Sequence, residues 1–203
     1  MNEITLQMRD VRSGYQDIEV LKGISLDILN SKITCMIGPN GAGKSTVLKT
    51  IYGILKARTG EILFKGERID GQSPLEILKR GISYVPQGRA IFPLMTVEEN
   101  LEMGAFIRKD DRITKDIADL IEKFPILGER RNTLAGNLSG GEAQILVLAM
   151  GLLLQPELML LDEPSMGLSP QSVGLIFRII KQINETGTTI LMVEQNARRA
   201  LEI

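Results

Sequence analysis

The glycine-rich segment at residues 38–46 constrains the fold of this chain more than any other feature. It reads Gly38-Pro39-Asn40-Gly41-Ala42-Gly43-Lys44-Ser45-Thr46, which fits the phosphate-binding pattern G-x-x-x-x-G-K-[ST]. The apolar run Ile33 to Ile37 precedes it and predicts a buried strand, and the run Val47 to Leu55 after it predicts a helix. A strand, a glycine-rich loop and a helix in this order predict a parallel α/β core that binds the phosphates of a nucleotide at the helix N-terminus.

Two acidic residues follow a second apolar run and predict the other half of a phosphate site. Leu158 to Leu161 has the composition of a buried strand, and Asp162 and Glu163 come directly after it. Ligands bind at the carboxyl ends of the strands in open α/β sheets. We therefore expect Asp162 to hold Mg²⁺, directly or through water, and Glu163 to polarise an attacking water. Lys44 is expected to bridge the β- and γ-phosphates, and the hydroxyl of Ser45 to ligate Mg²⁺.

The segment Leu138-Ser139-Gly140-Gly141-Glu142 combines a helix cap with two glycines. Ser139 and Glu142 have the spacing of a capping box, in which each side chain bonds to the backbone of the other residue, and Thr96 and Glu99 have the same spacing and predict a second one. The two glycines leave backbone amides unobstructed, and the serine adds a hydroxyl, so this helix N-terminus suits a γ-phosphate. A helix cap alone requires neither glycine.

In this order the three motifs resemble those of the ATP-binding-cassette (ABC) superfamily, and the resemblance covers essentially the whole chain. It implies an α/β fold: a P-loop ABC-type nucleotide-binding domain over residues 1–203, with an antiparallel β flap and an inserted helical subdomain at about residues 88–137. Alternating apolar residues in Ile4 to Val11 and Val20 to Ile28 predict two flap strands, with a turn at Ser13-Gly14-Tyr15. The family normally continues beyond the position of Ile203, so we expect the C-terminal part of the usual cassette to be absent.

The resemblance also assigns a role to each candidate site residue, with ATP and Mg²⁺ as the implied cofactors. Tyr15 matches the aromatic residue that stacks on adenine, and Gln87 matches the glutamine that senses Mg²⁺ and links to the helical subdomain. The segment Ser165 to Pro170 matches the loop that crosses the interface between two cassettes. The implied nucleotide contacts are Tyr15, Gly38, Asn40, Gly41, Ala42, Gly43, Lys44, Ser45, Thr46, Gln87, Ser139, Gly140, Gly141 and Glu142, and the implied metal contacts are Ser45, Gln87 and Asp162.

Gln195 is the second expected catalytic residue, beside Glu163. The superfamily usually has a histidine at this place, and this chain contains no histidine. In the subgroup that the chain resembles, a glutamine is usual. Its amide can donate a hydrogen bond to the γ-phosphate, but it cannot titrate near neutral pH. The alternative is that Gln195 only caps a helix that we expect to begin near Asn196.

Four short segments narrow the resemblance to one subgroup, the ATPase subunits of branched-chain (hydrophobic) amino acid importers. They are Val85-Pro86-Gln87-Gly88-Arg89, Phe92-Pro93, Met95-Thr96-Val97-Glu98-Glu99-Asn100-Leu101 and Val193-Glu194-Gln195-Asn196. Importers of urea and short amides have nearly the same segments and are an alternative. The resemblance implies a subunit that hydrolyses ATP to drive transport. Its implied partners are a second ABC subunit, identical or similar, a transmembrane permease and, through the permease, a periplasmic or extracellular solute-binding protein.

The net charge and the length of the apolar runs bear on whether the chain binds nucleic acid and whether it crosses a membrane. A net charge of −1 gives no electrostatic footprint for nucleic acid. The longest wholly apolar run, Ile145 to Leu154, is shorter than the roughly 20 residues that cross a bilayer. We therefore expect a peripheral protein held on the cytoplasmic face of the cell membrane by the permease.

Two alternatives to transport lie within the same superfamily. ABC ATPases of DNA repair need a long coiled-coil insertion, and residues 88–137 are too few for sustained heptads. ABC proteins that act on the ribosome normally carry two cassettes and basic extensions. A third alternative is a degenerate cassette that binds ATP without hydrolysis. Gln195 and an unusual Met150 favour it, whereas Lys44, Asp162 and Glu163 favour hydrolysis.

Overall fold

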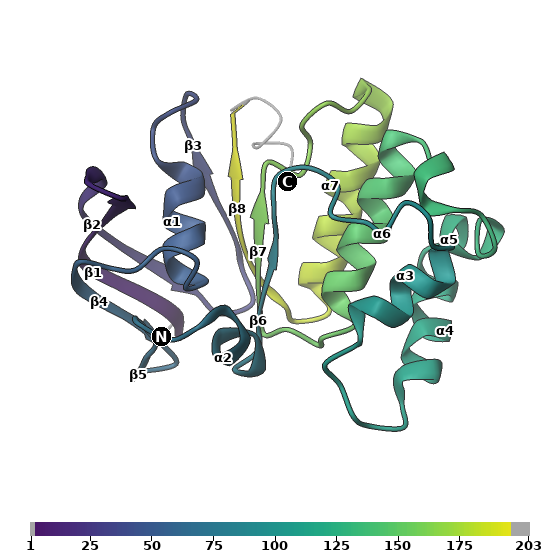
Figure 1. The fold of residues 1–203 in the computed structure, drawn as a ribbon, viewed down its shortest axis with the longest axis horizontal. Coiled ribbons are helices and arrows are strands. Elements are labelled where there is room, and N and C mark those ends of the chain that lie inside the picture. The colour runs from purple at the N-terminus through teal and green to yellow at the C-terminus, as the bar shows by residue number, and fades with distance from the viewer. Residues whose placement is uncertain (1–2, 196–203) are drawn as a thin grey trace.

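The computed structural model describes residues 3–195, which form two sheets with a helix between them and further helices on the far side (Figure 1). The elements along the chain are β1 (Ile4–Tyr15), β2 (Ile18–Leu29), β3 (Ile33–Ile37), α1 (Lys44–Ile51), β4 (Thr59–Phe64), β5 (Glu67–Arg68), α2 (Pro74–Lys79), β6 (Ile82–Val85), α3 (Val97–Gly104), α4 (Ile113–Lys123), α5 (Pro125–Glu129), the 3₁₀ turn η1 (Ala135–Asn137), α6 (Gly140–Leu152), β7 (Leu158–Asp162), α7 (Pro170–Glu185) and β8 (Thr189–Glu194).

The central sheet is parallel, with strand order β3-β8-β7-β6. Strands β7 and β8 are buried along their whole length because elements cover both faces of the sheet. This confirms the predicted α/β core. The prediction that Ile33 to Ile37 is fully buried is wrong, because β3 pairs only with β8 in the described sheet and is partly exposed.

The N-terminal sheet is antiparallel, with strand order β2-β1-β4-β5, and it forms the predicted flap. The turn predicted at Ser13-Gly14-Tyr15 is wrong, because β1 continues to Tyr15, which pairs with Ile18 of β2. Register shifts along the β1–β2 pairing interrupt the regular alternation of apolar residues beyond Met8. The alternation therefore ends before the strand does, and the chain reverses at residues 16–17.

Two hydrophobic cores lie on opposite faces of the parallel sheet, and α1 separates that sheet from the flap (Figure 1). Successive residues of β7 divide between the cores because side chains alternate along a strand. Leu158 and Leu160 pack with α1 and the flap, whereas Met159 and Leu161 pack with the helices on the other side. The start of α1 is thus fixed at the carboxyl end of β3, and this places the glycine-rich loop.

Helices α6 and α7 cover the outer face of the sheet, and α3, α4 and α5 lie beyond them (Figure 1). The two predicted capping boxes are confirmed, at Thr96 before α3 and at Ser139 before α6. A third, at Ser73 before α2, was not predicted. Within residues 3–195 no helix has the length and apolarity of a membrane span.

Candidate nucleotide-binding site

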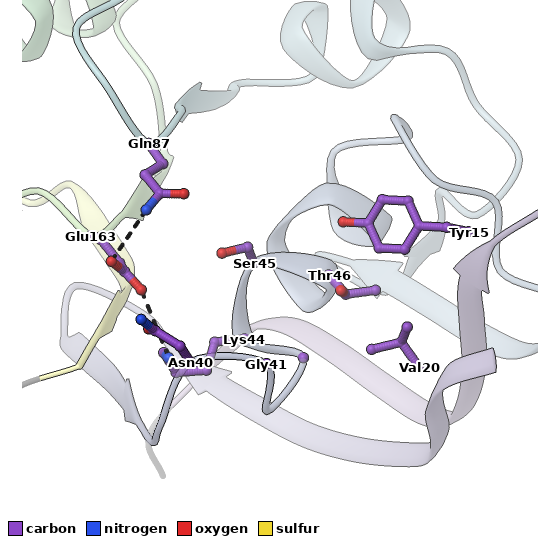
Figure 2. A pocket seen from close by; sticks show the side chains of 10 residues that line it. Tyr15, Val20, Asn40, Gly41, Lys44, Ser45, Thr46, Gln87 and Glu163 are labelled. Carbon is purple, nitrogen blue, oxygen red and sulfur yellow. Dashed lines mark hydrogen bonds and ion pairs between the residues drawn. The ribbon is translucent and has the colours of Figure 1, made fainter. Parts of the chain in front are cut away.

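A cavity of about 380 Å³ lies over the N-terminus of α1, between the flap and the carboxyl ends of the parallel strands (Figure 2). The residues that line it are Tyr15, Val20, Asn40, Gly41, Gly43, Lys44, Ser45, Thr46, Gln87 and Glu163. Nine of these ten were expected from the sequence, and they come from four separate parts of the chain. Val20 was not expected, because nothing in the flap sequence marks one valine of a strand as a wall of a site.

The glycine-rich loop presents backbone rather than side chains to this cavity. Gly41 and Gly43 have φ values of 80° and 89°, in the left-handed region that favours glycine. Gly43 is the N-cap of α1, and a Cβ added to it would lie 3.2 Å from Cγ1 of Val20. No side chain caps α1, so its first amides are free to donate to an anion, and the helix dipole favours a negative charge there.

The ammonium group of Lys44 lies across the mouth of the loop. Its Nζ donates hydrogen bonds to the carbonyl oxygens of Gly38 and Pro39, at 2.8 and 3.1 Å. It also lies 3.8 Å from Oε1 of Glu163, and both side chains are almost fully buried. A buried cation held by neutral carbonyls and one carboxylate can exchange these partners for phosphate oxygens.

Asp162 is buried and accepts a hydrogen bond at each of its carboxylate oxygens. Ser45 Oγ donates to Oδ1 at 2.7 Å, and Tyr84 Oη donates to Oδ2 at 3.0 Å. Burial and the charge of Asp162 raise the pKa of the Tyr84 phenol well above its ordinary value, so the phenol keeps its proton. The hydroxyl of Ser45 and the carboxylate of Asp162 are the oxygen donors that Mg²⁺ prefers, and the residues present fit that ion.

Glu163 occupies the side of the cavity opposite Tyr15 (Figure 2). Its φ of 49° is in the left-handed region, and its N–H donates to the carbonyl oxygen of Val193 at 3.1 Å. Its Oε2 accepts a hydrogen bond from Nε2 of Gln87 at 3.3 Å. Gln87 also contacts Sδ of Met166 at 2.9 Å. The carboxylate is therefore held between an ammonium group and an amide, with its side chain aimed at the loop.

Tyr15 forms the flap side of the cavity (Figure 2). Its side chain is 42% exposed, and Nζ of Lys49 lies 5.8 Å from the centroid of its ring. An exposed aromatic ring, supported from the flap and facing the loop across the cavity, offers a flat apolar surface to a planar ligand.

Several predicted site residues do not line this cavity. Gly38 and Ala42 belong to the loop but are not among the lining residues, and Asp162 lines a second cavity of about 260 Å³ that shares Glu163. Gln195 is exposed in a bend after β8. The helix expected to begin near Asn196 lies outside the described residues.

The segment Ser139 to Glu142 also lies away from the cavity, at the start of α6. Oγ of Ser139 accepts the hydrogen bond of the Glu142 amide at 3.3 Å, as a helix cap does. A Cβ added to Gly141 would lie 2.8 Å from Oγ of Ser172. The absence of a side chain at Gly141 therefore allows α6 to pack closely against Ser172 of α7, a role that the sequence alone did not indicate.

Tyr84, Ser165 and Glu194 were missed as supporting residues of the site. Tyr84 carried a usable signal, because a tyrosine in an apolar strand needs a partner for its hydroxyl. Ser165 and Glu194 carried none, because their contact joins residues 29 apart in the sequence.

Comparison with known proteins gives one consistent result. Residues 21–166 match the family model described as ABC transporter. The chain is 41% identical to the high-affinity branched-chain amino acid transport ATP-binding protein BraG of Pseudomonas aeruginosa, over 98% of this chain and 85% of that protein. It is 39% identical to the probable branched-chain amino acid transport ATP-binding protein LivF of Archaeoglobus fulgidus, over 95% and 82%. Among solved structures, the ADP conformation of MJ1267, an ATP-binding cassette of an ABC transporter, superposes with a TM-score of 0.89 at 27% identity, over 98% of this chain and 84% of that one.

Proposed function

The chain belongs to the ABC transporter family, and from that premise we propose that it is the ATP-binding and ATP-hydrolysing subunit of an importer for branched-chain or other hydrophobic amino acids. The observation that carries the ATPase part is the convergence of Lys44, Ser45, Asp162 and Glu163 at the N-terminus of α1. Lys44 and Ser45 precede Asp162 and Glu163 by more than a hundred positions in the sequence. The fold brings Ser45 within hydrogen-bond distance of Asp162 and Lys44 within ion-pair distance of Glu163.

The triphosphate of ATP binds to the free amides at the start of α1, with Lys44 turned from the loop carbonyls to the β- and γ-phosphates. The adenine lies against the exposed ring of Tyr15 on the flap side. Ser45 and Asp162 would hold Mg²⁺, together with Gln87, which also lines the cavity. When bound, that ion supplies neutralisation of the phosphate charge.

Hydrolysis is a phosphoryl transfer to water, so the chain contributes positioning and charge neutralisation. Glu163 accepts a hydrogen bond from the attacking water and orients it toward the γ-phosphate. Its position in the lining of both cavities supports this role. Gln195, directly after β8, donates its amide hydrogen to the γ-phosphate.

Each complete site is formed by two subunits. The segment Ser139 to Glu142 binds the γ-phosphate of an ATP held by the loop of the other subunit, through the hydroxyl of Ser139 and the backbone amides of Gly140 and Gly141. One observation supports this: the N-terminus of α6 does not line the cavity of its own chain.

The transport role places the subunit on a permease at the cytoplasmic face of the membrane. The exposed apolar residues Phe92 and Leu94, which precede α3, support a docking surface on the helical region next to Gln87. Relatives named for branched-chain amino acid transport share 41% and 39% identity with the chain, whereas the lipopolysaccharide export protein LptB of Haemophilus influenzae shares 35%. This ranking supports an amino acid as the transported solute.

Steady-state hydrolysis of Mg-ATP by the full chain tests the proposal, together with calorimetry of nucleotide binding. Lys44→Ala is expected to abolish ATP binding, because the loop carbonyls cannot neutralise the phosphates. Unchanged affinity in that variant would place the nucleotide elsewhere. Copurification from membranes tests the transport part: a multi-span permease is the expected partner, and recovery with ribosomes or DNA alone would contradict transport.

A further inference from the structure

Glu194, the last residue of β8, is a buried carboxylate that does not line the nucleotide cavity. Only 3% of the residue is exposed. Its Oε1 accepts a hydrogen bond from the Ser165 amide at 3.1 Å, and its Oε2 accepts one from Ser165 Oγ at 3.0 Å. A carboxylate removed from water is costly unless it is hydrogen-bonded, and Ser165 supplies both bonds.

Ser165 belongs to the tight turn that begins at Glu163. The Met166 amide donates to the carbonyl oxygen of Glu163 at 3.1 Å and closes this turn. The backbone of Glu163 has a positive φ, which is unfavourable for a residue with a side chain and persists only where the surroundings fix it. Two contacts fix it to the end of β8: the carbonyl oxygen of Val193 holds the Glu163 amide, and the carboxylate of Glu194 holds Ser165.

We propose that Glu194 is a positioning residue for ATP hydrolysis, which holds the turn at Ser165 so that the carboxylate of Glu163 points between Lys44 and Gln87. The inference rests on the proposed function, because the proposed function gives Glu163 the task of orienting the attacking water. Glu194 acts at a distance, through the Ser165 turn, and touches neither the nucleotide nor the water. Without it, the strained backbone of Glu163 relaxes and its carboxylate leaves the attack position.

The surroundings of Glu194 make a conservative variant interpretable. Burial raises the pKa of Glu194, the hydrogen bonds from Ser165 oppose that rise, and the nearby charge of Glu163 adds to it. A neutral glutamine of the same shape avoids the cost of burying a charge. Glu194→Gln is therefore expected to fold. Its carbonyl oxygen can still accept the hydrogen bond from the Ser165 amide, whereas its NH2 group cannot accept the one from the Ser165 hydroxyl.

The experiment compares ATP hydrolysis and fluorescent-ATP binding in the wild type, Glu194→Gln, Ser165→Ala, Glu163→Gln and the double variant Glu163→Gln/Glu194→Gln. Glu194→Gln is expected to lower kcat by about 10- to 100-fold, the effect of a misplacement of about 1 Å, with KM and ATP affinity unchanged. Ser165→Ala, which removes only the hydroxyl, is expected to lower kcat less. In the Glu163→Gln background, Glu194→Gln is expected to have no further effect on the single-turnover rate.

Ser83→Ala is the matched control. Ser83 is a buried serine of the same sheet whose hydroxyl has no hydrogen-bond partner in the described part of the chain, so its removal is expected to leave kcat unchanged. Thermal melts accompany every variant, and if Glu194→Gln does not fold, the comparison of Ser165→Ala with Ser83→Ala decides the question.

Three results would overturn the inference: a normal kcat in folded Glu194→Gln, a normal kcat in Ser165→Ala, or an equal loss of rate from Glu194→Gln with and without Glu163. A wild type that hydrolyses no ATP would instead refute the proposed function itself.

Discussion

Asp162 shows how much of a site depends on side chains that do not touch the ligand. Both of its oxygens are occupied, one by Ser45 and one by Tyr84, and the ring of Tyr84 lies 5.3 Å from that of Tyr52. The phenol therefore determines which way the carboxylate faces. Groups that orient a metal ligand in this way typically change metal affinity by 10–100-fold when removed.

Tyr84→Phe is accordingly expected to weaken the binding of Mg²⁺ about 10-fold while ATP still binds in the absence of metal. A titration of Mg²⁺ against nucleotide-loaded protein, followed by calorimetry, measures this. Tyr52→Phe is the control, because it keeps the ring contact and loses a hydroxyl that does not contact Asp162. Equal Mg²⁺ affinity in Tyr84→Phe and the wild type would show that Ser45 alone orients the carboxylate.

Gln195→Ala is expected to slow turnover and to leave ATP affinity nearly unchanged, the pattern for a bond made mainly in the transition state. A single donor of this kind is worth about 10²–10³ in rate in other enzymes, and a neutral amide at an exposed position is expected to give less. Rate and melting temperature are measured on the same variant. A lowered melting temperature with a normal rate per folded molecule would instead indicate a structural cap.

Arg108 holds helix α4 and the loop before it in place through ion pairs. Its guanidinium joins the loop before α4 to α4 itself, through Asp110 at 2.7 Å and Asp116 at 2.6 Å, and to the end of α6 through the carbonyl oxygen of Leu153. The hydrogen bond from Arg108 lowers the pKa of Asp110 from its ordinary 3.8 to about 2. The ionised carboxylate is thus favoured by folding, which gives the stability of this region a defined pH dependence.

Because the folded pKa lies below the ordinary value, the contribution of Asp110 is complete above pH 3.8 and is lost as the pH falls through about 2. Asp110→Asn is therefore expected to lower the melting temperature at neutral pH and to match the wild type near pH 2. Asp111→Asn is the control, since Asp111 is exposed and has no ion pair among residues 3–195. A difference between wild type and Asp110→Asn that persists unchanged at the lowest pH would contradict the ion pair.

The molecule as a whole is expected to act as a dimer closed by ATP. Glu163→Gln removes the carboxylate that orients water but leaves the phosphate contacts in place, so it should retain ATP and hydrolyse little of it. Size-exclusion chromatography in Mg-ATP is then expected to show more dimer than for the wild type. Ser139→Ala in the same background is expected to reduce that dimer, and an unchanged dimer would remove α6 from the shared site.

The parts of this fold that the sequence predicted are those with local signals. The loop, the strand β7 and the caps of α3 and α6 each follow from a few neighbouring residues, as does the proximity of Asp162 to Ser45 at one sheet edge. The predictions that were wrong or missing concern places where contacts between residues far apart in the sequence determine the structure. Register shifts against β2 extend β1 to Tyr15, the edge position exposes β3, and the bond between Glu194 and Ser165 has no local trace.

The cavity lies between two sheets that share no strand: Tyr15 and Val20 lie on one, and Glu163 directly follows β7 of the other (Figure 2). A ligand that touches both walls couples the opening of the flap to its own release. At a free concentration 100 times Kd, such linkage adds about 2.7 kcal/mol to the free energy of unfolding. Hydrogen exchange at the amides of β1 and β2, which are far from Glu163 in the sequence, is then expected to slow as the fraction of occupied sites rises. The exchange rate of the flap amides therefore measures ligand binding.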